Sequence, residues 1–383
     1  MKRRRAFFAL TMTLAVVTVA RSGHELPVYP SFYPHEIALT AVTPERAAEL
    51  LSTGKIQAYV GAAPRFAGTP PATVKSVDSL GSFVVVRIHP SSSLAKDAKS
   101  SCAVGETIIR DLVGKGGDLI VHPYPVTPFH GDYLHHADLA EAAKARILGN
   151  RDTASGSAIP IVKVKAVTER VRSLVRPEWR AEGSNWDAEL AEISAAELIA
   201  STRYSMNGWI GPAWLRSGWF SASVLLGERM HDEDLVGRVR SQVRRLQTSN
   251  FANAVERINL ERSLVSTLAA DCFARVVGYT LRREYFSTVF EAGVENIAYD
   301  SVTGFNSPMF IRTVKLRDFP WNGWLSLGMD GAPGAAWNPV AGFTDEFGRL
   351  MWSAVGDPVV LPAPNESAWM FNRIADVQSS AAQ

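Results

Sequence analysis

Several features that would assign a function directly are missing from this sequence. It has only two cysteines, Cys102 and Cys272, and no C-x-x-C pair, which excludes paired-cysteine zinc sites and haem attached through C-x-x-C-H. The nucleophile elbow G-x-S-x-G, the P-loop, H-E-x-x-H and G-x-G-x-x-G are also absent. "SLAK" (Ser93 to Lys96) has the S-x-x-K spacing without its companion motifs. No named catalytic motif therefore assigns a reaction.

An excess of charge of one sign is missing as well. Forty basic and 38 acidic side chains leave a formal net charge of +2. A nucleic-acid-binding protein would normally carry a basic face or tail, so we expect no nucleic-acid partner. Hydrophobic residues make up 46% and charged residues 20% of the 383 positions, which is typical of a globular chain long enough for two domains.

The one long apolar run lies at the N-terminus. A basic segment (Lys2–Arg5) precedes fifteen mostly apolar residues (Ala6–Ala20) that end in small side chains. This pattern predicts an export signal at residues 1–20 that is removed from the mature protein; an uncleaved anchor is the alternative. "RRAFF" (Arg4 to Phe8) also approximates a twin-arginine signal, beside the ordinary secretory route. We expect a periplasmic or secreted protein whose mature form has no membrane span.

Export would place the two cysteines in an oxidising compartment and leave residues 21–40 at the start of the mature protein. In an oxidising compartment Cys102 and Cys272 can form a disulfide between the two halves of the chain, or stay as two buried thiols. The sequence leaves this open. Residues 21–40 interleave three prolines with aromatic residues, which disfavours a helix and predicts an extended Pro/Tyr arm.

Residues 41–176 alternate between strand and helix patterns. "TPERAAELLSTG" predicts a helix capped by Thr43, and "KIQAYVG", "FVVVRIH", "DLIVHPYPV" and "AIPIVKV" predict strands. Strands that alternate with helices favour βαβ units. We therefore predict an α/β N-terminal domain with a mostly parallel sheet.

Helical periodicity dominates after the polar segment 176–187, which we take as the domain boundary. "WDAELAEISAAELIASTRY" and "DLVGRVRSQVRRLQ" carry apolar stripes at helical spacing, and we expect helix, with breaks, to about Val294. The end of the chain is rich in Gly, Pro and Trp. Residues 187–383 are therefore predicted to form a mainly helical, Trp-rich domain with long loops, and an α+β fold for the whole chain is the alternative.

Half of the eight histidines lie in the segment 122–136, "HPYPVTPFHGDYLHH". His122 follows a predicted strand, prolines stiffen the next loop, and His130, Asp132 and His136 come just before a predicted helix. Imidazoles and a carboxylate that converge from two elements suit Zn²⁺, Cu²⁺ or Fe²⁺. We predict His122, His130, Asp132 and His136 as metal ligands. The alternative is structural: a helix cap and packed or solvated histidines.

A second candidate site comes from the ten tryptophans of the chain. Trp321, Trp324 and Trp337 lie in the Gly/Pro-rich C-terminal region, where aromatic side chains can stack against a ligand. They can equally cap a core or dock one domain on another. We predict these three residues as ligand-binding candidates.

Three functions are compatible with this sequence. The first is an exported protein that binds a small ligand or a metal, as a binding or accessory component of a transport or redox system. The second is a metal-dependent periplasmic hydrolase or oxidoreductase that uses the His/Asp cluster. The third is a structural subunit that meets a periplasmic protein partner. The binding function is favoured because no catalytic motif is present.

Overall fold

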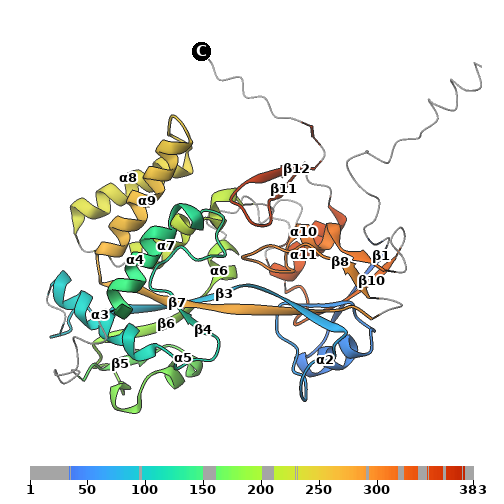
Figure 1. Cartoon of the computed structure of the whole chain (residues 1–383), viewed down its shortest axis with the longest axis horizontal. Coiled ribbons are helices and arrows are strands. Elements are labelled where there is room, and N and C mark those ends of the chain that lie inside the picture. The colour runs from blue at the N-terminus through green and yellow to red at the C-terminus, as the bar shows by residue number, and fades with distance from the viewer. Residues whose placement is uncertain are drawn as a thin grey trace, which may run out of the picture.

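The computed structural model describes most of the chain (Figure 1). The predicted export signal, most of the predicted arm, Trp321 and Trp337 lie outside the described residues. Within the described part, no helix is long and apolar enough to cross a membrane. The described residues are 34, 36–94, 97–149, 161–200, 211–228, 230, 232–289, 293–317, 323–334, 343, 345–356, 359–372 and 374–375.

Two long antiparallel strands form the axis of the molecule. β3 (Val74–Ile88) and β7 (Ala274–Ser287) pair from Val74↔Ser287 to Arg87↔Ala274. Figure 1 shows both strands running from a larger group of helices at one end to a smaller group of elements at the other. We name these groups the first lobe, which includes the described residues within 97–149 and 161–270, and the second lobe, which includes the described residues within 36–66 and 293–372.

The main sheet is mixed. Its eight strands follow the order β1 (Glu36–Ala41), β10 (Trp324–Met329), β2 (Ala58–Val60), β7, β3, β6 (Ala188–Ser194) and β5 (Val164–Ala166), with β4 (Leu119–Val121) beside β7. The pairs β1–β10, β10–β2 and β5–β6 are parallel, whereas β2–β7, β7–β3, β3–β6 and β4–β7 are antiparallel. The mixed α/β sheet confirms an α+β fold. It corrects the expectation of a mostly parallel sheet, because β7 inserts from the distant C-terminal half of the chain.

The continuous apolar run "FVVV" in β3 follows from burial on both faces. Phe83 and Val85 face one hydrophobic cluster, with α7 (Gly218–Gly227), α8 (Glu233–Gln247) and α9 (Ala254–Ala270). Val84 and Val86 face the other, with α3 (Ala98–Leu112) and α5 (Glu169–Leu174). Successive side chains of a strand point to opposite faces of the sheet. Because both faces of this part of β3 are covered, every position is apolar and the usual alternation of apolar and polar residues is missing.

The remaining elements complete the two lobes. The first lobe adds η1 (Tyr133–His135), α4 (Ala137–Leu148), η3 (Pro177–Trp179), α6 (Ala195–Ala200) and η4 (Ala213–Arg216). The second lobe contains α2 (Pro44–Ser52), β8 (Val294–Asn296), α10 (Pro308–Thr313), β9 (Lys315–Leu316), α11 (Glu346–Val355), β11 (Val360–Pro362) and β12 (Trp369–Phe371). The predicted cap of α2 is confirmed, because the Thr43 side chain accepts a hydrogen bond from the Arg46 amide.

Two segments predicted as helix are strands. Residues 188–194 form β6, although alanine and glutamate favour a helix, because pairing with β3 buries this segment. Residues 274–287 form β7, whose valines, threonine and aromatic residues suit a pleated strand. The domain boundaries remain a prediction, and the main sheet takes strands from both sides of the segment 176–187.

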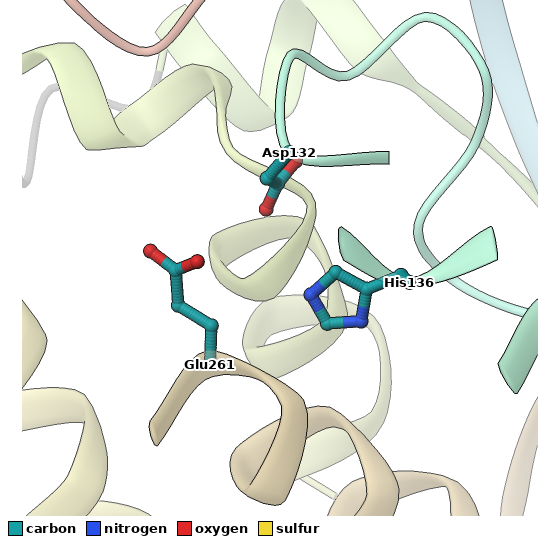
Figure 2. Close-up of side chains that lie close together, drawn as sticks. All are labelled: Asp132, His136 and Glu261. Carbon is teal, nitrogen blue, oxygen red and sulfur yellow. The ribbon is translucent and has the colours of Figure 1, made fainter. Parts of the chain in front are cut away.

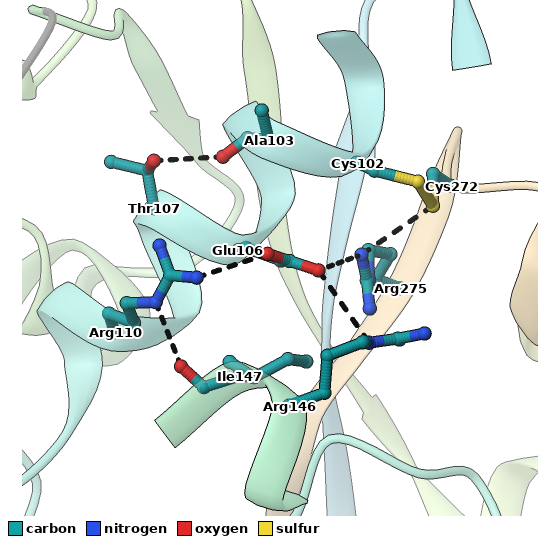
Figure 3. Close-up of polar contacts among 9 residues, drawn as sticks. All are labelled: Cys102, Ala103, Glu106, Thr107, Arg110, Arg146, Ile147, Cys272 and Arg275. Atoms are coloured by element: carbon teal, nitrogen blue, oxygen red, sulfur yellow. Dashed lines mark hydrogen bonds and ion pairs between the residues drawn. A yellow bond between two sulfur atoms is a disulfide. The ribbon is translucent and has the colours of Figure 1, made fainter. Parts of the chain in front are cut away.

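The disulfide that the sequence left open is formed. Cys102 of α3 is bonded to Cys272, just before β7, across 170 residues of sequence. Beside it, Figure 3 shows the Glu106 carboxylate between several cations, among them Arg275, whose Nη1 lies 3.4 Å from Glu106 Oε1. The disulfide and this charge cluster tie α3 to the first strand residues of β7.

Candidate functional site

The histidine-rich segment leaves β4 at Val121 and crosses the first lobe toward α4. His122 is 7% exposed, and its Nε2 lies 2.9 Å from the Val126 carbonyl oxygen. Because a carbonyl only accepts, Nε2 carries the proton and donates it. Burial lowers the pKa of His122. His122 therefore closes the turn at residues 122–126, which we call the proline-rich turn.

His130 is also held by protein partners. The Thr127 amide donates to Nδ1 over 3.0 Å, so the neutral ring carries its proton on Nε2. Nε2 lies 3.3 Å from Ser221 Oγ of α7 and donates to it. A general base would instead have to accept the serine proton at this nitrogen. The Ser221–His130 contact is thus the reverse of a catalytic serine–histidine pair, and burial, which lowers the pKa of His130, keeps the ring neutral.

Asp132 links the segment to the start of α7. Both carboxylate oxygens accept from the Gly218 amide at 3.0 Å. The first amides of a helix have no partner within the helix and favour a negative charge. A Cβ at Gly218 would lie 2.4 Å from the Val126 side chain, so only glycine permits this approach of α7 to the turn. Asp132 is 6% exposed.

His136 and Glu261 face Asp132 from two further elements. His136 precedes α4, and its Nδ1 lies 2.9 Å from the Tyr124 hydroxyl. Burial lowers the pKa of His136 to about 4. Glu261 belongs to α9, where Oε1 accepts from Arg257 at 2.9 Å. Burial raises the pKa of Glu261 to about 7, against the lowering effect of Arg257.

One donor atom from each of Asp132, His136 and Glu261 lies within 4.8 Å of the others. Figure 2 shows the three side chains converging from different elements. We call these residues the buried triad. The structure therefore brings together two of the four predicted metal ligands, Asp132 and His136, while His122 and His130 hydrogen-bond elsewhere.

The sequence did not lead us to predict Glu261 as a site residue, although its position on an apolar helix face was a usable signal. It lies on the apolar side of α9, among the buried residues Leu260, Leu264, Val265 and Leu268. A carboxylate on the buried stripe of an amphipathic helix requires a partner. The sequence does not show which distant side chain lies opposite.

The second candidate site predicted from the sequence consisted of three tryptophans, and a cavity between the two lobes is lined by other tryptophans. Of the three predicted residues, the described one, Trp324, is the first residue of β10 and is 71% exposed. It does not line the cavity between the lobes. Two other tryptophans, Trp352 of α11 and Trp369 of β12, line that cavity.

The cavity has a volume of about 440 Å³. Its first-lobe wall comes from α6 and η4, and its second-lobe wall from α10, α11, β11 and β12. The lining is mostly apolar and includes charged side chains of both signs. Its charged and aromatic lining residues include Glu197, Arg282, Glu346, Arg349, Trp352 and Trp369.

A buried ion pair joins the lobes at this cavity. Arg216 of η4 donates to Asp300 Oδ2 at 2.7 Å, and the two side chains are 9% and 4% exposed. Arg216 also donates to the backbone carbonyls of Ala363 and Ala368, next to β11 and β12. Asp300 Oδ1 accepts from the Val302 amide at 2.9 Å. This network fixes the second-lobe wall against η4.

Burial also affects Arg349, which projects from α11 into the lining. Loss of water lowers the pKa of the Arg349 guanidinium, and Asp345 and Glu346 act in the opposite direction. A guanidinium normally titrates far above neutral pH, so Arg349 stays charged. In this mostly apolar wall the guanidinium is stabilised by the neighbouring carboxylates of Asp345 and Glu346.

Comparisons with known proteins give a limited likeness. No family model matches the chain, and no curated protein matches it. Among solved structures, the oligopeptide-binding protein AppA of Bacillus subtilis, in complex with a nonapeptide, aligns at 12% identity and a TM-score of 0.39, covering 72% of this chain and 59% of that one. DppA of Helicobacter pylori, an ABC transporter-associated periplasmic binding protein in complex with the peptide STSA, gives 12% identity, a TM-score of 0.39, and coverages of 72% and 55%.

A third solved structure, AgaA from A. tumefaciens in complex with agropinic acid, aligns at 11% identity and a TM-score of 0.39, with coverages of 72% and 59%. The chain thus spans less than two thirds of the length of these three solved chains. Similarity at this level does not assign a function to this chain.

Proposed function

We propose that this protein is an exported binding protein that holds a short peptide, or a zwitterion of similar chemistry, between its two lobes and delivers it to a transport system. The observation that carries the proposal is the cavity of about 440 Å³ with a wall from each lobe. Small-molecule sites are typically concave, mostly apolar and about 300–1,000 Å³ in volume, with a few polar groups that orient the ligand.

The charges in the lining favour a ligand that carries both signs. Arg282 and Arg349 offer guanidinium groups, and Glu197 and Glu346 offer carboxylates. Guanidinium groups bind a carboxylate through charge-assisted hydrogen bonds, and a glutamate can bind an ammonium group. Trp352 and Trp369 add aromatic surface for the apolar part of a ligand.

Export is supported by two observations. The basic and apolar residues at positions 1–20 have the pattern of an export signal. The Cys102–Cys272 disulfide is the kind of bond that persists in an oxidising compartment. The proposal places the chain in the functional class of AppA and DppA, and its support is the cavity.

Titration of the purified protein with pooled di- to pentapeptides tests the proposal. We expect binding to shift the tryptophan fluorescence and to raise the melting temperature. Arg349→Gln should weaken binding about 10- to 100-fold, because it removes the charge from one ligand hydrogen bond. Trp352→Phe should reduce the fluorescence change.

Two matched variants control for general effects. Arg240→Gln removes an exposed arginine of α8, and Trp324→Phe changes an exposed tryptophan outside the cavity lining. Both should bind like the unaltered protein. The proposal fails if no peptide pool changes the fluorescence or the melting temperature, or if Arg349→Gln binds as tightly as Arg240→Gln.

A further inference from the structure

The buried triad contains polar atoms whose hydrogen-bonding capacity is unused. His136 Nε2 and Glu261 Oε2 are both buried, and neither has a hydrogen-bond partner among the residues that the structure describes. The residues are 0% and 3% exposed. Each unsatisfied buried polar atom is costly, and such atoms are uncommon in native proteins. Two of them facing one another, with Asp132 beside them, point to a missing group.

Both neutral tautomers of His136 leave Nε2 without a described hydrogen-bond partner. If Nδ1 donates to the Tyr124 hydroxyl, the lone pair of Nε2 faces the carboxylates of Asp132 and Glu261. If the hydroxyl donates to Nδ1, the proton on Nε2 has no acceptor within hydrogen-bond distance. The first arrangement is the one that metal-bound histidines adopt, with the second nitrogen hydrogen-bonded to an orienting group.

Each member of the buried triad has such an orienting contact. Tyr124 holds His136, the Gly218 amide holds Asp132, and Arg257 holds Glu261 Oε1. These contacts leave His136 Nε2, Glu261 Oε2 and further lone pairs of the Asp132 oxygens close to a common point (Figure 2). The supporting contacts come from the proline-rich turn, from α7 and from α9, so the site is held by rigid elements.

The distances allow a cation after a small adjustment. The three donor atoms lie within 4.8 Å of one another. Ligands about 2.1 Å from one metal ion lie about 3–3.5 Å apart. The flexible Glu261 side chain can close this difference by rotation about its own bonds.

We infer that Asp132, His136 and Glu261 form a buried binding site for a divalent metal ion. One imidazole and two carboxylates suit Zn²⁺ or Mn²⁺. The two negative charges balance the ion, which would join the turn after β4 to α9 in the core of the first lobe. None of the three residues lines the cavity between the lobes, so the ion has a structural role. The competing occupant is a proton shared between the carboxylates.

Metal binding can be tested on the full-length protein. The protein is unfolded and refolded in the presence of a chelator, freed of the chelator, and supplied with zinc chloride or manganese chloride in separate samples. Elemental analysis should find one metal ion per chain. At about one hundred times the dissociation constant, the melting temperature should rise by about 3 °C.

Substitutions of the proposed ligands locate the site. Glu261→Gln and His136→Gln should abolish the metal-dependent shift, whereas Glu141→Gln, an exposed carboxylate on the adjacent α4, should retain it. Metal-free Glu261→Gln should melt no lower than the metal-free unaltered protein, because the amide oxygen can still accept from the partly exposed Arg257 while a buried negative charge is removed. This control separates loss of the site from loss of folding.

Two results would overturn the inference. In the first, neither metal binds the unaltered protein, and the carboxylates share a proton. In the second, the metal-dependent shift persists in Glu261→Gln and His136→Gln, and the ion lies elsewhere. The comparison between zinc and manganese decides which ion the site prefers.

Discussion

Buried polar groups are satisfied at the cavity between the lobes, whereas some of those in the buried triad are not. At the cavity, the buried Arg216–Asp300 pair satisfies both partners and joins the two lobes. In the buried triad, His136 and Glu261 keep unpaired atoms in a region closed to water. Paired charges can be part of a fixed framework, whereas unpaired ones need a proton or an ion. The proposed ligand site therefore lies beside satisfied charges, whereas the proposed metal site lies among unsatisfied polar atoms.

The largest effect should come from breaking the pair at the cavity. Asp300→Ala leaves the Arg216 guanidinium buried without its carboxylate and removes an acceptor of the Val302 amide. We expect the free energy of unfolding to fall by about 3–5 kcal/mol, the usual cost of removing one partner of a buried pair. Urea unfolding followed by circular dichroism measures this change.

An exposed pair provides the control. Arg283 binds both oxygens of Asp78 at 2.7 and 2.8 Å, and the two side chains are 50% and 34% exposed. Asp78→Ala should cost less than about 1 kcal/mol, because water screens such a pair. Equal losses for Asp300→Ala and Asp78→Ala would contradict the role given to the Arg216–Asp300 pair.

A smaller effect is expected beside the buried triad. Ser221→Ala removes the acceptor of the His130 Nε2 proton and should lower the free energy of unfolding by about 1–3 kcal/mol. Ser223→Ala, on the same helix, removes a hydroxyl that donates to the Phe220 carbonyl, and should cost less than about 1 kcal/mol. Urea unfolding at pH 7 compares them. If Ser221→Ala were as stable as Ser223→Ala, the hydrogen bond assigned to His130 would be wrong.

The sequence was informative where neighbouring residues determine the structure. The Thr43 cap, the strand "FVVVRIH" and the convergence of Asp132 and His136 depend on residues close in sequence. What it could not supply were contacts over long separations: Glu261 opposite His136, and β7 between β2 and β3. For the segment 188–194, pairing with β3 overrode local helix propensity.

The smallest effect concerns pH and an ion pair between α9 and α4, close in sequence to two members of the buried triad. Arg262 of α9 binds both oxygens of Asp138 at 2.7 Å, and this hydrogen bonding lowers the pKa of Asp138 to about 2. An unfolded aspartate titrates near pH 3.9, so the contribution is complete above that pH and is lost as the pH falls toward about 2. Asp138→Asn should therefore be less stable than the unaltered protein at pH 6, and the difference should vanish near pH 2. Urea midpoints measured across this range test it, with Glu141→Gln as a control that leaves the Asp138–Arg262 pair intact. A difference that stays constant with pH would mean that the pair contributes through packing, and the hydrogen bond from Arg262 to the His135 carbonyl would then be the polar contact that links α9 to this turn.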